Sequence, residues 1–168
     1  MKHSLVVMGV SGCGKSSLGE LLARSLGARF VEGDAHHSPA SRAKMSQGIA
    51  LTDADREGWL NTLAAELRQP PLPIVLTCSS LKRAYRDRLR AAAPGLRFVF
   101  MDISREAALQ RVASRGAAHF FSASLVDNQF ATLERPDGEA GVLRVDAEAP
   151  LSQLQDEVGA WLAKEEHP

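Results

Sequence analysis

One short segment near the N-terminus limits the possible folds more than any other feature of this sequence. Residues 9–16 read Gly-Val-Ser-Gly-Cys-Gly-Lys-Ser, which fits the phosphate-loop pattern G-x-x-x-x-G-K-[ST] at every fixed position. The apolar run Leu5–Met8 before it predicts a strand, and Ser16–Leu26 after it predicts a helix. A glycine-rich turn with a surface lysine is the alternative, but it does not account for this setting. We therefore expect a nucleoside triphosphate site.

The residues of this loop have separate expected roles. Its glycines let backbone N–H groups turn toward a phosphate, and the start of the following helix adds partial positive charge. The Lys15 ammonium is expected to contact the β- and γ-phosphates, and the Ser16 hydroxyl is expected to bind Mg²⁺. The expected cofactors are thus ATP and Mg²⁺. The predicted ATP-binding residues are Gly9, Val10, Ser11, Gly12, Cys13, Gly14, Lys15, Ser16, Ser17 and Arg111.

Length and charge indicate what kind of partner to expect. The chain has 168 residues, which suits a single domain over residues 1–168. Its 20 Lys and Arg residues balance 20 Asp and Glu residues, so no overall field favours nucleic acid or an anionic membrane. No apolar run is long enough to span a bilayer, and no signal-peptide pattern is present. We expect a cytoplasmic protein with a small-molecule substrate. Two cysteines are too few for a disulfide framework, so we expect reduced thiols.

Hydrophobic periodicity predicts five strands that alternate with helices. Strands are expected at Leu5–Met8, Arg29–Glu32, Ile74–Cys78, Leu96–Ile103 and Val142–Val145. Helices are expected at 16–26, 41–47, 53–69, 82–90, 104–114 and 124–133, and from Pro150 onward. This alternation predicts a P-loop NTPase-type α/β fold, a three-layer α/β/α domain with a five-stranded parallel sheet and right-handed crossovers.

Two segments outside the phosphate loop are expected to complete a site. Asp34 directly follows the second strand, at the carboxyl end where open α/β sheets bind ligands. The stretch 35–51, with few apolar residues and two histidines, predicts an insertion that binds the acceptor. Residues 115–123 combine small residues with an arginine, a histidine and two phenylalanines, which is typical of a lid that closes and excludes water.

Motifs along the rest of the chain narrow the function further. They comprise Gly33-Asp34 with His37, Lys44-Met45, Gly48, Leu51-Thr52-Asp53-Ala54-Asp55-Arg56, Trp59-Leu60, Cys78-Ser79-Ser80-Leu81-Lys82, Tyr85-Arg86-Asp87, His119-Phe120, Gln129-Phe130 and Leu133-Glu134. Together with the phosphate loop, these motifs resemble the bacterial and eukaryotic gluconokinase family over essentially the whole chain. The D-x-D-R and C-S-x-L-K-x-x-Y-R-D blocks are the most specific, because shikimate and adenylate kinases of the same fold lack them.

The resemblance implies ATP-dependent phosphorylation of D-gluconate at its 6-hydroxyl, with magnesium, by a homodimer. The predicted catalytic residues are Lys15, Asp34 and Arg115. The predicted substrate-binding residues are Asp34, His37, Arg56, Lys82, Arg86 and His119. A carboxylate with several hydroxyls calls for cationic donors, which the three basic residues of the central blocks offer. Gln129, Phe130 and Glu134 are expected to be mainly structural.

Several roles have an open alternative. Asp34 either orients the attacking hydroxyl and accepts its proton, or holds a water of the magnesium ion. Arg56 either binds the acceptor or pairs with Asp53 or Asp55 on its own helix. His37 either touches the acceptor or lies on the surface. Arg111 and Arg115 flank the approach to the lid, where one or both could reach the transferring phosphoryl group.

The sequence departs from the family pattern at three places. Ser38 separates His37 from Pro39, and Ser41 replaces the usual asparagine. The lid is one residue longer and lacks the lysine or glutamate before its glycine, while Gly58 replaces a proline before the tryptophan. Two rival functions therefore stay open: a kinase of another small sugar acid or shikimate-like acceptor, and a non-catalytic nucleotide-binding regulator.

Overall fold

A five-stranded parallel sheet forms the centre of the protein in the computed structural model, which describes residues 1–115 and 123–166. The strand order is β2-β3-β1-β4-β5. The strands are β1 (Leu5–Met8), β2 (Arg29–Glu32), β3 (Ile74–Thr77), β4 (Arg97–Asp102) and β5 (Val142–Asp146). All four neighbouring pairs are parallel. The five expected strands and the parallel sheet are confirmed, with ends that differ by one residue at most.

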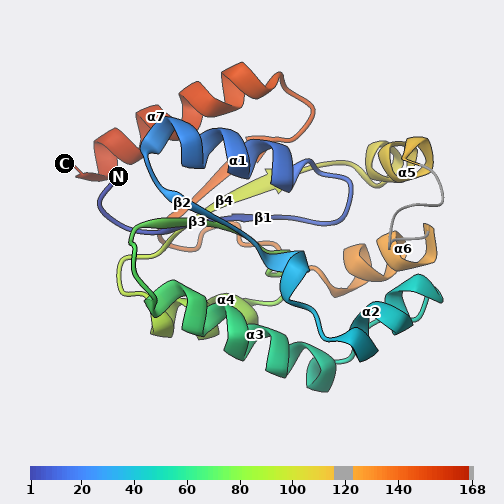
Figure 1. The fold of residues 1–168 in the computed structure, drawn as a ribbon. Coiled ribbons are helices and arrows are strands. Elements are labelled where there is room, and N and C mark those ends of the chain that lie inside the picture. The colour runs from blue at the N-terminus through green and yellow to red at the C-terminus, as the bar shows by residue number, and fades with distance from the viewer. Residues whose placement is uncertain (116–122, 167–168) are drawn as a thin grey trace.

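Helices cover both faces of this sheet (Figure 1). They are α1 (Lys15–Leu26), α2 (Pro39–Ser46), α3 (Asp53–Arg68), α4 (Arg83–Ala92), α5 (Arg105–Ser114), α6 (Ala123–Thr132) and α7 (Leu151–Glu166). The short 3-10 helix η1 (Gly33–His36), which periodicity did not predict, follows β2 directly. The expected insertion between β2 and β3 contains η1 and α2, whereas residues 116–122 of the expected lid lie outside the described residues.

The two apolar cores follow from the alternation of side chains along the strands. Leu5 and Val7 of β1 belong to the core with α1 and α7, while Val6 and Met8 belong to the core with α3 and α4. Successive strand residues point to opposite faces, so a strand covered on both sides must be apolar throughout. All four residues of β1 are buried, which explains why this segment reads as an unbroken apolar run.

Side-chain caps define the starts of the helices around the insertion. Ser38 caps α2 by accepting a hydrogen bond from the Ser41 backbone N–H at 3.1 Å, and Pro39 occupies the first turn. Thr52 and Asp55 form a reciprocal capping box at the start of α3. The departure from the family pattern at Ser38 thus creates a regular helix start.

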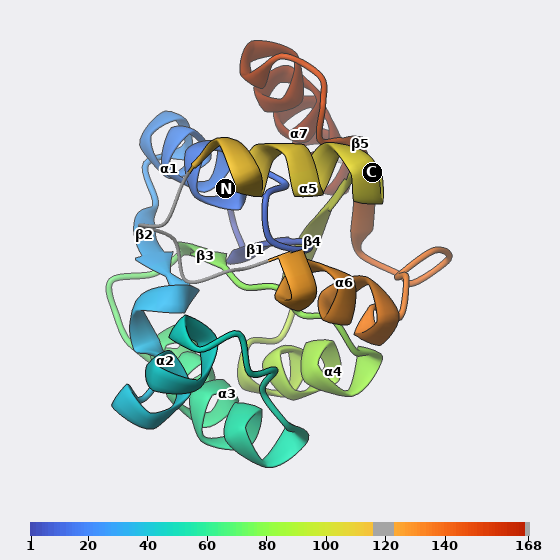
Figure 2. The same ribbon diagram turned by 90° about the vertical axis from the view of Figure 1, so that its right-hand side faces the viewer.

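The carboxyl ends of the strands meet at one edge of the sheet. β1 leads into the phosphate loop, β2 into η1, and β3 into residues 78–82. Figure 2 views this edge, with α2, α5 and α6 in front of the sheet. Gly33 permits the close approach of β2 and β3 here, since a Cβ at this position would lie 2.0 Å from the Thr77 carbonyl oxygen.

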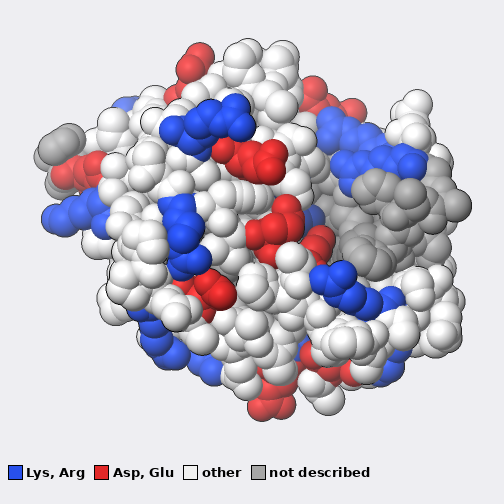
Figure 3. Space-filling model, viewed as in Figure 1, with Lys and Arg blue, Asp and Glu red and all other residues white. Residues whose placement is uncertain are grey.

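The surface carries both signs of charge. On the face shown in Figure 3, Lys and Arg side chains alternate with Asp and Glu side chains instead of forming one large patch of a single sign. This distribution agrees with the formal net charge of zero. Among the residues that the structure describes, no helix is both long enough and apolar enough to cross a membrane.

Candidate active site

The phosphate loop is held in shape by its own lysine and by α5. Lys15 Nζ donates to the carbonyl oxygens of Gly9, at 3.0 Å, and Val10, at 3.1 Å. Gly12 has a φ of +86°, and a Cβ there would lie 2.9 Å from the Ala108 carbonyl oxygen of α5. A side chain at this position would therefore meet both backbone strain and a clash, which is why the loop needs glycine here.

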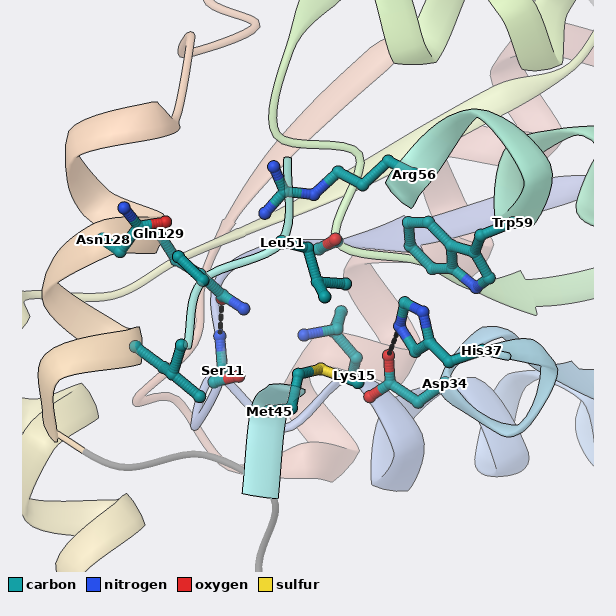
Figure 4. A pocket seen from close by; sticks show the side chains of 13 residues that line it. Ser11, Lys15, Asp34, His37, Met45, Leu51, Arg56, Trp59, Asn128 and Gln129 are labelled. Carbon is teal, nitrogen blue, oxygen red and sulfur yellow. Dashed lines mark hydrogen bonds and ion pairs between the residues drawn. The ribbon is translucent and has the colours of Figure 1, made fainter. Parts of the chain in front are cut away.

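A cavity of about 450 Å³, including its open mouth, lies beside the phosphate loop. Ser11 and Lys15 of the loop line one part of it, Asp34 and His37 another, and Arg56 reaches in from α3 (Figure 4). The remaining lining residues are Met45, Ala50, Leu51, Trp59, Ser79, Leu125, Asn128 and Gln129. Residues from the loop, the insertion, α3 and α6 thus share a single cavity.

Asp34 and His37 form a pair in this cavity. His37 Nε2 lies 3.5 Å from Asp34 Oδ1, and the imidazole stacks on Trp59 with a centroid distance of 4.3 Å. Trp59 is fixed in turn, since its Nε1 donates to the Gly33 carbonyl oxygen at 2.8 Å. His37 is therefore a buried cavity residue and not a surface histidine.

The surroundings of Asp34 favour its ionised form. Burial raises the pKa of this carboxyl, but the hydrogen bond from His37 and the positive charge of Lys15 outweigh burial and hold the pKa below its ordinary value. Asp34 is consequently a carboxylate at neutral pH, able to accept a hydrogen bond from a hydroxyl group in the cavity.

Arg56 is buried, and none of the described carboxylates pairs with it. Its guanidinium lies 5.8 Å from the centre of the Tyr85 ring. Within residues 1–115 and 123–166, no carboxylate lies at ion-pair distance from Arg56. Asp53 instead bonds Lys82 and Tyr85, and Asp55 bonds Lys44. Arg56 therefore does not form the alternative ion pair with Asp53 or Asp55 of its own helix.

Two other predicted substrate ligands lie apart from the cavity lining. Lys82 Nζ donates to Asp53 Oδ1 at 2.9 Å and lies 5.8 Å from the centre of the Tyr85 ring. Arg86 is fully buried, forms an ion pair with Glu139, and donates to the carbonyl oxygens of Ser80 and Leu81. These donors join α4 to neighbouring segments, and the predicted contact of Arg86 with substrate stays a prediction.

The arginines near the expected lid have different positions. Arg111 Nη1 lies 3.2 Å from the carbonyl oxygens of both Gly12 and Cys13, and Nη2 donates to the Ala147 carbonyl oxygen at 3.1 Å. Arg111 thus packs against the phosphate loop, while its ATP-binding role stays a prediction. Arg115 is exposed just beyond the end of α5. His119 lies outside the described residues.

Two residues, Glu32 and Gln129, contact the phosphate loop in ways that the sequence patterns do not predict. Glu32 accepts hydrogen bonds from the hydroxyls of Ser16 and Thr77, each at 2.6 Å. Its position at the carboxyl end of β2, two residues before Asp34, was the available signal. Gln129, expected to be structural, is buried in the cavity wall and accepts a hydrogen bond from the Ser11 backbone N–H at 2.7 Å.

Both cysteines are free and buried near the loop. Cys13 has its sulfur 3.9 Å from Lys15 Nζ. Burial raises the pKa of the Cys78 thiol to about 11, so this thiol stays protonated at neutral pH. The environment of Cys78 is that of an inert core residue.

Comparisons with known proteins found relatives in both sequence and structure. An AAA domain family matches residues 5–136. A gluconokinase from Gluconobacter oxydans (strain 621H) is 47% identical over 147 residues, which cover 86% of this chain and 82% of the relative. The crystal structure of a gluconokinase from Sinorhizobium meliloti 1021 superposes with a TM-score of 0.88 at 47% identity, covering 96% of this chain and 92% of that one.

A more distant structure shares the fold. Shikimate kinase from Aquifex aeolicus superposes with a TM-score of 0.69 at 18% identity and covers 98% of both chains. At this level of identity the likeness concerns the arrangement of strands and helices alone.

Proposed function

The chain belongs to the gluconokinase family, and from this premise we propose that it transfers the γ-phosphoryl group of ATP to the 6-hydroxyl of D-gluconate. The products are 6-phospho-D-gluconate and ADP. Membership of this family makes the protein a phosphotransferase. The finer assignments, namely the position of transfer and the role of each residue, are inferred from the site.

One observation carries this proposal: the cavity joins the phosphate loop to an acceptor wall. Lys15 lies on the phosphate side, and Asp34, His37 and Arg56 lie on the other sides of the same space. Phosphoryl transfer depends mainly on positioning and on stabilising charge, so a donor site and an acceptor site must open into one space.

Asp34 is the residue we assign to the attacking hydroxyl. It is ionised at neutral pH and lines the cavity, and the positive charge of Lys15 stabilises its carboxylate. Its carboxylate can accept the hydroxyl hydrogen bond, orient the oxygen toward the phosphoryl group and take up the proton. His37 holds the carboxylate in place, while its stack on Trp59 keeps the imidazole fixed. We give the metal-water alternative to Glu32 instead, because Glu32 is the carboxylate that bonds Ser16.

The residues around Ser16 suit Mg²⁺. This cation prefers oxygen ligands and binds kinase sites through few protein groups, keeping waters and phosphate oxygens as its other ligands. The Ser16 hydroxyl and the Glu32 carboxylate are adjacent oxygen groups beside the phosphate loop. They would hold the ion, which when bound neutralises negative charge on the phosphates.

The cationic side chains of the site have separate proposed roles. We assign Lys15 to the phosphates, since its present bonds to loop carbonyl oxygens can be exchanged for bonds to phosphate oxygens. We assign Arg56, buried and free of a carboxylate partner among the described residues, to the gluconate carboxylate. Arg111 holds the phosphate loop, and Arg115 is proposed to reach the phosphoryl group. Several points stay predictions: the roles of Lys82 and His119, the single domain over residues 1–168, the homodimer and the cytoplasmic location.

The first experiment measures ADP release with Mg-ATP and a panel of acceptors at equal concentration: D-gluconate, shikimate, glycerate and nucleoside monophosphates. We expect kcat/KM to be highest for gluconate, and we expect the Lys15→Ala variant to lose turnover while remaining folded. Preference for another acceptor would overturn the choice of gluconate. ATP binding without turnover on any acceptor would favour the alternative function, a non-catalytic nucleotide-binding regulator.

A further inference from the structure

Gln129 of α6 makes an unusual connection between the cavity wall and the phosphate loop. Its side chain is 8% exposed and lines the cavity. Its Oε1 accepts a hydrogen bond from the backbone N–H of Ser11 at 2.7 Å, across a sequence separation of 118 residues. Ser11 lies inside the phosphate loop, so this bond ties α6 to the loop.

This bond determines which way the carboxamide faces. An amide side chain carries one acceptor oxygen and one NH₂ group on the same trigonal carbon. Because only the oxygen can accept from the Ser11 N–H, the NH₂ group must point elsewhere. Figure 4 shows it directed into the cavity. In the part of the chain that the structure describes, no acceptor is bonded to Gln129 Nε2.

The neighbouring groups indicate what this NH₂ group would bind. The Arg56 guanidinium extends from α3 into the same space and also presents donors, while the Asp34 carboxylate supplies acceptors elsewhere in the cavity (Figure 4). A ligand that fills the cavity would bury these donors, and buried donors need hydrogen-bond partners, so such a ligand must be rich in oxygen atoms. A sugar acid, with a carboxylate and several hydroxyls, supplies such atoms.

We propose that Gln129 is a substrate-binding residue whose side-chain N–H donates to an oxygen of gluconate, and that the Ser11 N–H holds the amide in that orientation. This inference rests on the proposed function. A single side chain then contacts the phosphate loop through its oxygen and the acceptor through its nitrogen. The specificity of the site for an oxygen-rich acid depends on Gln129 together with Arg56.

Two substitutions separate this role from mere support of the loop. Gln129→Glu keeps an oxygen for the Ser11 N–H but removes the NH₂ donor, whereas Gln129→Met removes both groups without adding charge. We expect both variants to raise the KM for gluconate by roughly 5- to 50-fold. This range corresponds to the loss of one hydrogen bond to a hydroxyl or carboxylate oxygen of the ligand. The dissociation constant for Mg-ATP, measured without acceptor, should change by less than about threefold, since the loop itself is intact.

The matched control is Gln153→Glu on the exposed face of α7, which should leave all constants unchanged. The inference is overturned if Gln129→Glu behaves like wild type, since Gln129 then only supports the loop. It is also overturned if only the glutamate variant is impaired, which indicates charge repulsion, or if weaker ATP binding accounts for the loss. Failure of the wild-type protein to phosphorylate gluconate would overturn the proposed function and this inference together.

Discussion

Arg56 and Arg86 are both buried, yet their guanidinium groups have different partners. Arg86 has an ion pair with Glu139 and several backbone acceptors. Arg56 has the face of Tyr85, and among the described residues no carboxylate lies close enough to pair with it. A buried charge without a counter-ion is costly unless a ligand supplies one. We therefore propose that Arg56 binds an anionic ligand and that Arg86 stabilises the fold.

Replacing Arg56 should therefore affect the acceptor and not the nucleotide. We expect Arg56→Ala to lower kcat/KM for gluconate by about 10- to 150-fold, the range for a lost charge-assisted hydrogen bond. The Mg-ATP dissociation constant should stay within about threefold of wild type. Steady-state kinetics and calorimetric titration measure the two quantities. Arg24→Ala, at the exposed end of α1, is the control. An unchanged gluconate KM and kcat would refute the assignment.

Replacing Arg86 should have the opposite consequence. Arg86→Met leaves the buried Glu139 carboxylate with Arg90 alone, so we expect the free energy of unfolding to fall by about 3 kcal/mol. The gluconate KM of the folded variant should stay at the wild-type value. Urea unfolding and kinetics provide the measurements, and Arg88→Met, exposed on the same helix, is the control. A raised KM with unchanged stability would restore Arg86 as a substrate ligand.

At the scale of elements, the start of α3 supports the acceptor wall. The Asp55 carboxylate accepts a hydrogen bond from the Thr52 backbone N–H and pairs with Lys44 of α2 at 2.8 Å. The hydrogen bond from Lys44, followed by that from Thr52, lowers the pKa of Asp55 to about 2. This carboxylate thus joins the helix that carries Arg56 and Trp59 to the inserted helix α2.

The lowered pKa of Asp55 predicts a pH dependence of stability. A carboxyl whose pKa is lowered by folding contributes stability above its unfolded pKa, and this contribution is lost as pH falls through the folded value. Asp55→Asn should therefore lower the urea midpoint near neutral pH, and the difference from wild type should shrink as pH falls from about 4 toward 2. Asp156→Asn on the exposed side of α7 should show no such trend. A difference that is independent of pH would contradict this account.

At the scale of the whole molecule, the strand order brings distant segments together. β1 lies between β3 and β4, so the phosphate loop is surrounded by segments that follow other strands. The Gly9 backbone N–H donates to the Ser79 carbonyl oxygen, and Arg111 of α5 bonds the Gly12 and Cys13 carbonyl oxygens. A ligand bound in the loop therefore contacts a structure that exists only when the whole sheet is folded.

Nucleotide binding should consequently stabilise the entire protein. With Mg-ATP at about 100 times its dissociation constant, the free energy of unfolding should rise by about 2.7 kcal/mol. For a chain of this length, that corresponds to an increase in Tm of roughly 5–10 °C. Differential scanning fluorimetry measures the shift. The Lys15→Ala variant should show little or none of it. Absence of a shift in the wild type at saturating Mg-ATP would contradict the assigned nucleotide site.

Most of the fold could be predicted from sequence because its signals are local. The apolar run of β1, the phosphate-loop glycines and the Thr52 cap each act within a few residues. The helix η1 was missed because four residues carry too little periodicity. Motifs predict Lys15, Asp34, His37 and Arg56 as site residues. The structure places all four around one cavity, and their roles stay predictions.

The strand–loop–helix at residues 5–26 and the family could be recognised without a structure, since both depend on residue types at short, fixed spacings. The choice of polar groups that face the cavity, in contrast, depends on how the elements pack in three dimensions. This packing turns Arg86 toward Glu139, brings Glu32 to Ser16, and places Gln129 against Ser11. The physical reason is that each of these contacts joins different elements, so it depends on how helices pack on the sheet. No local pattern of residues records that packing.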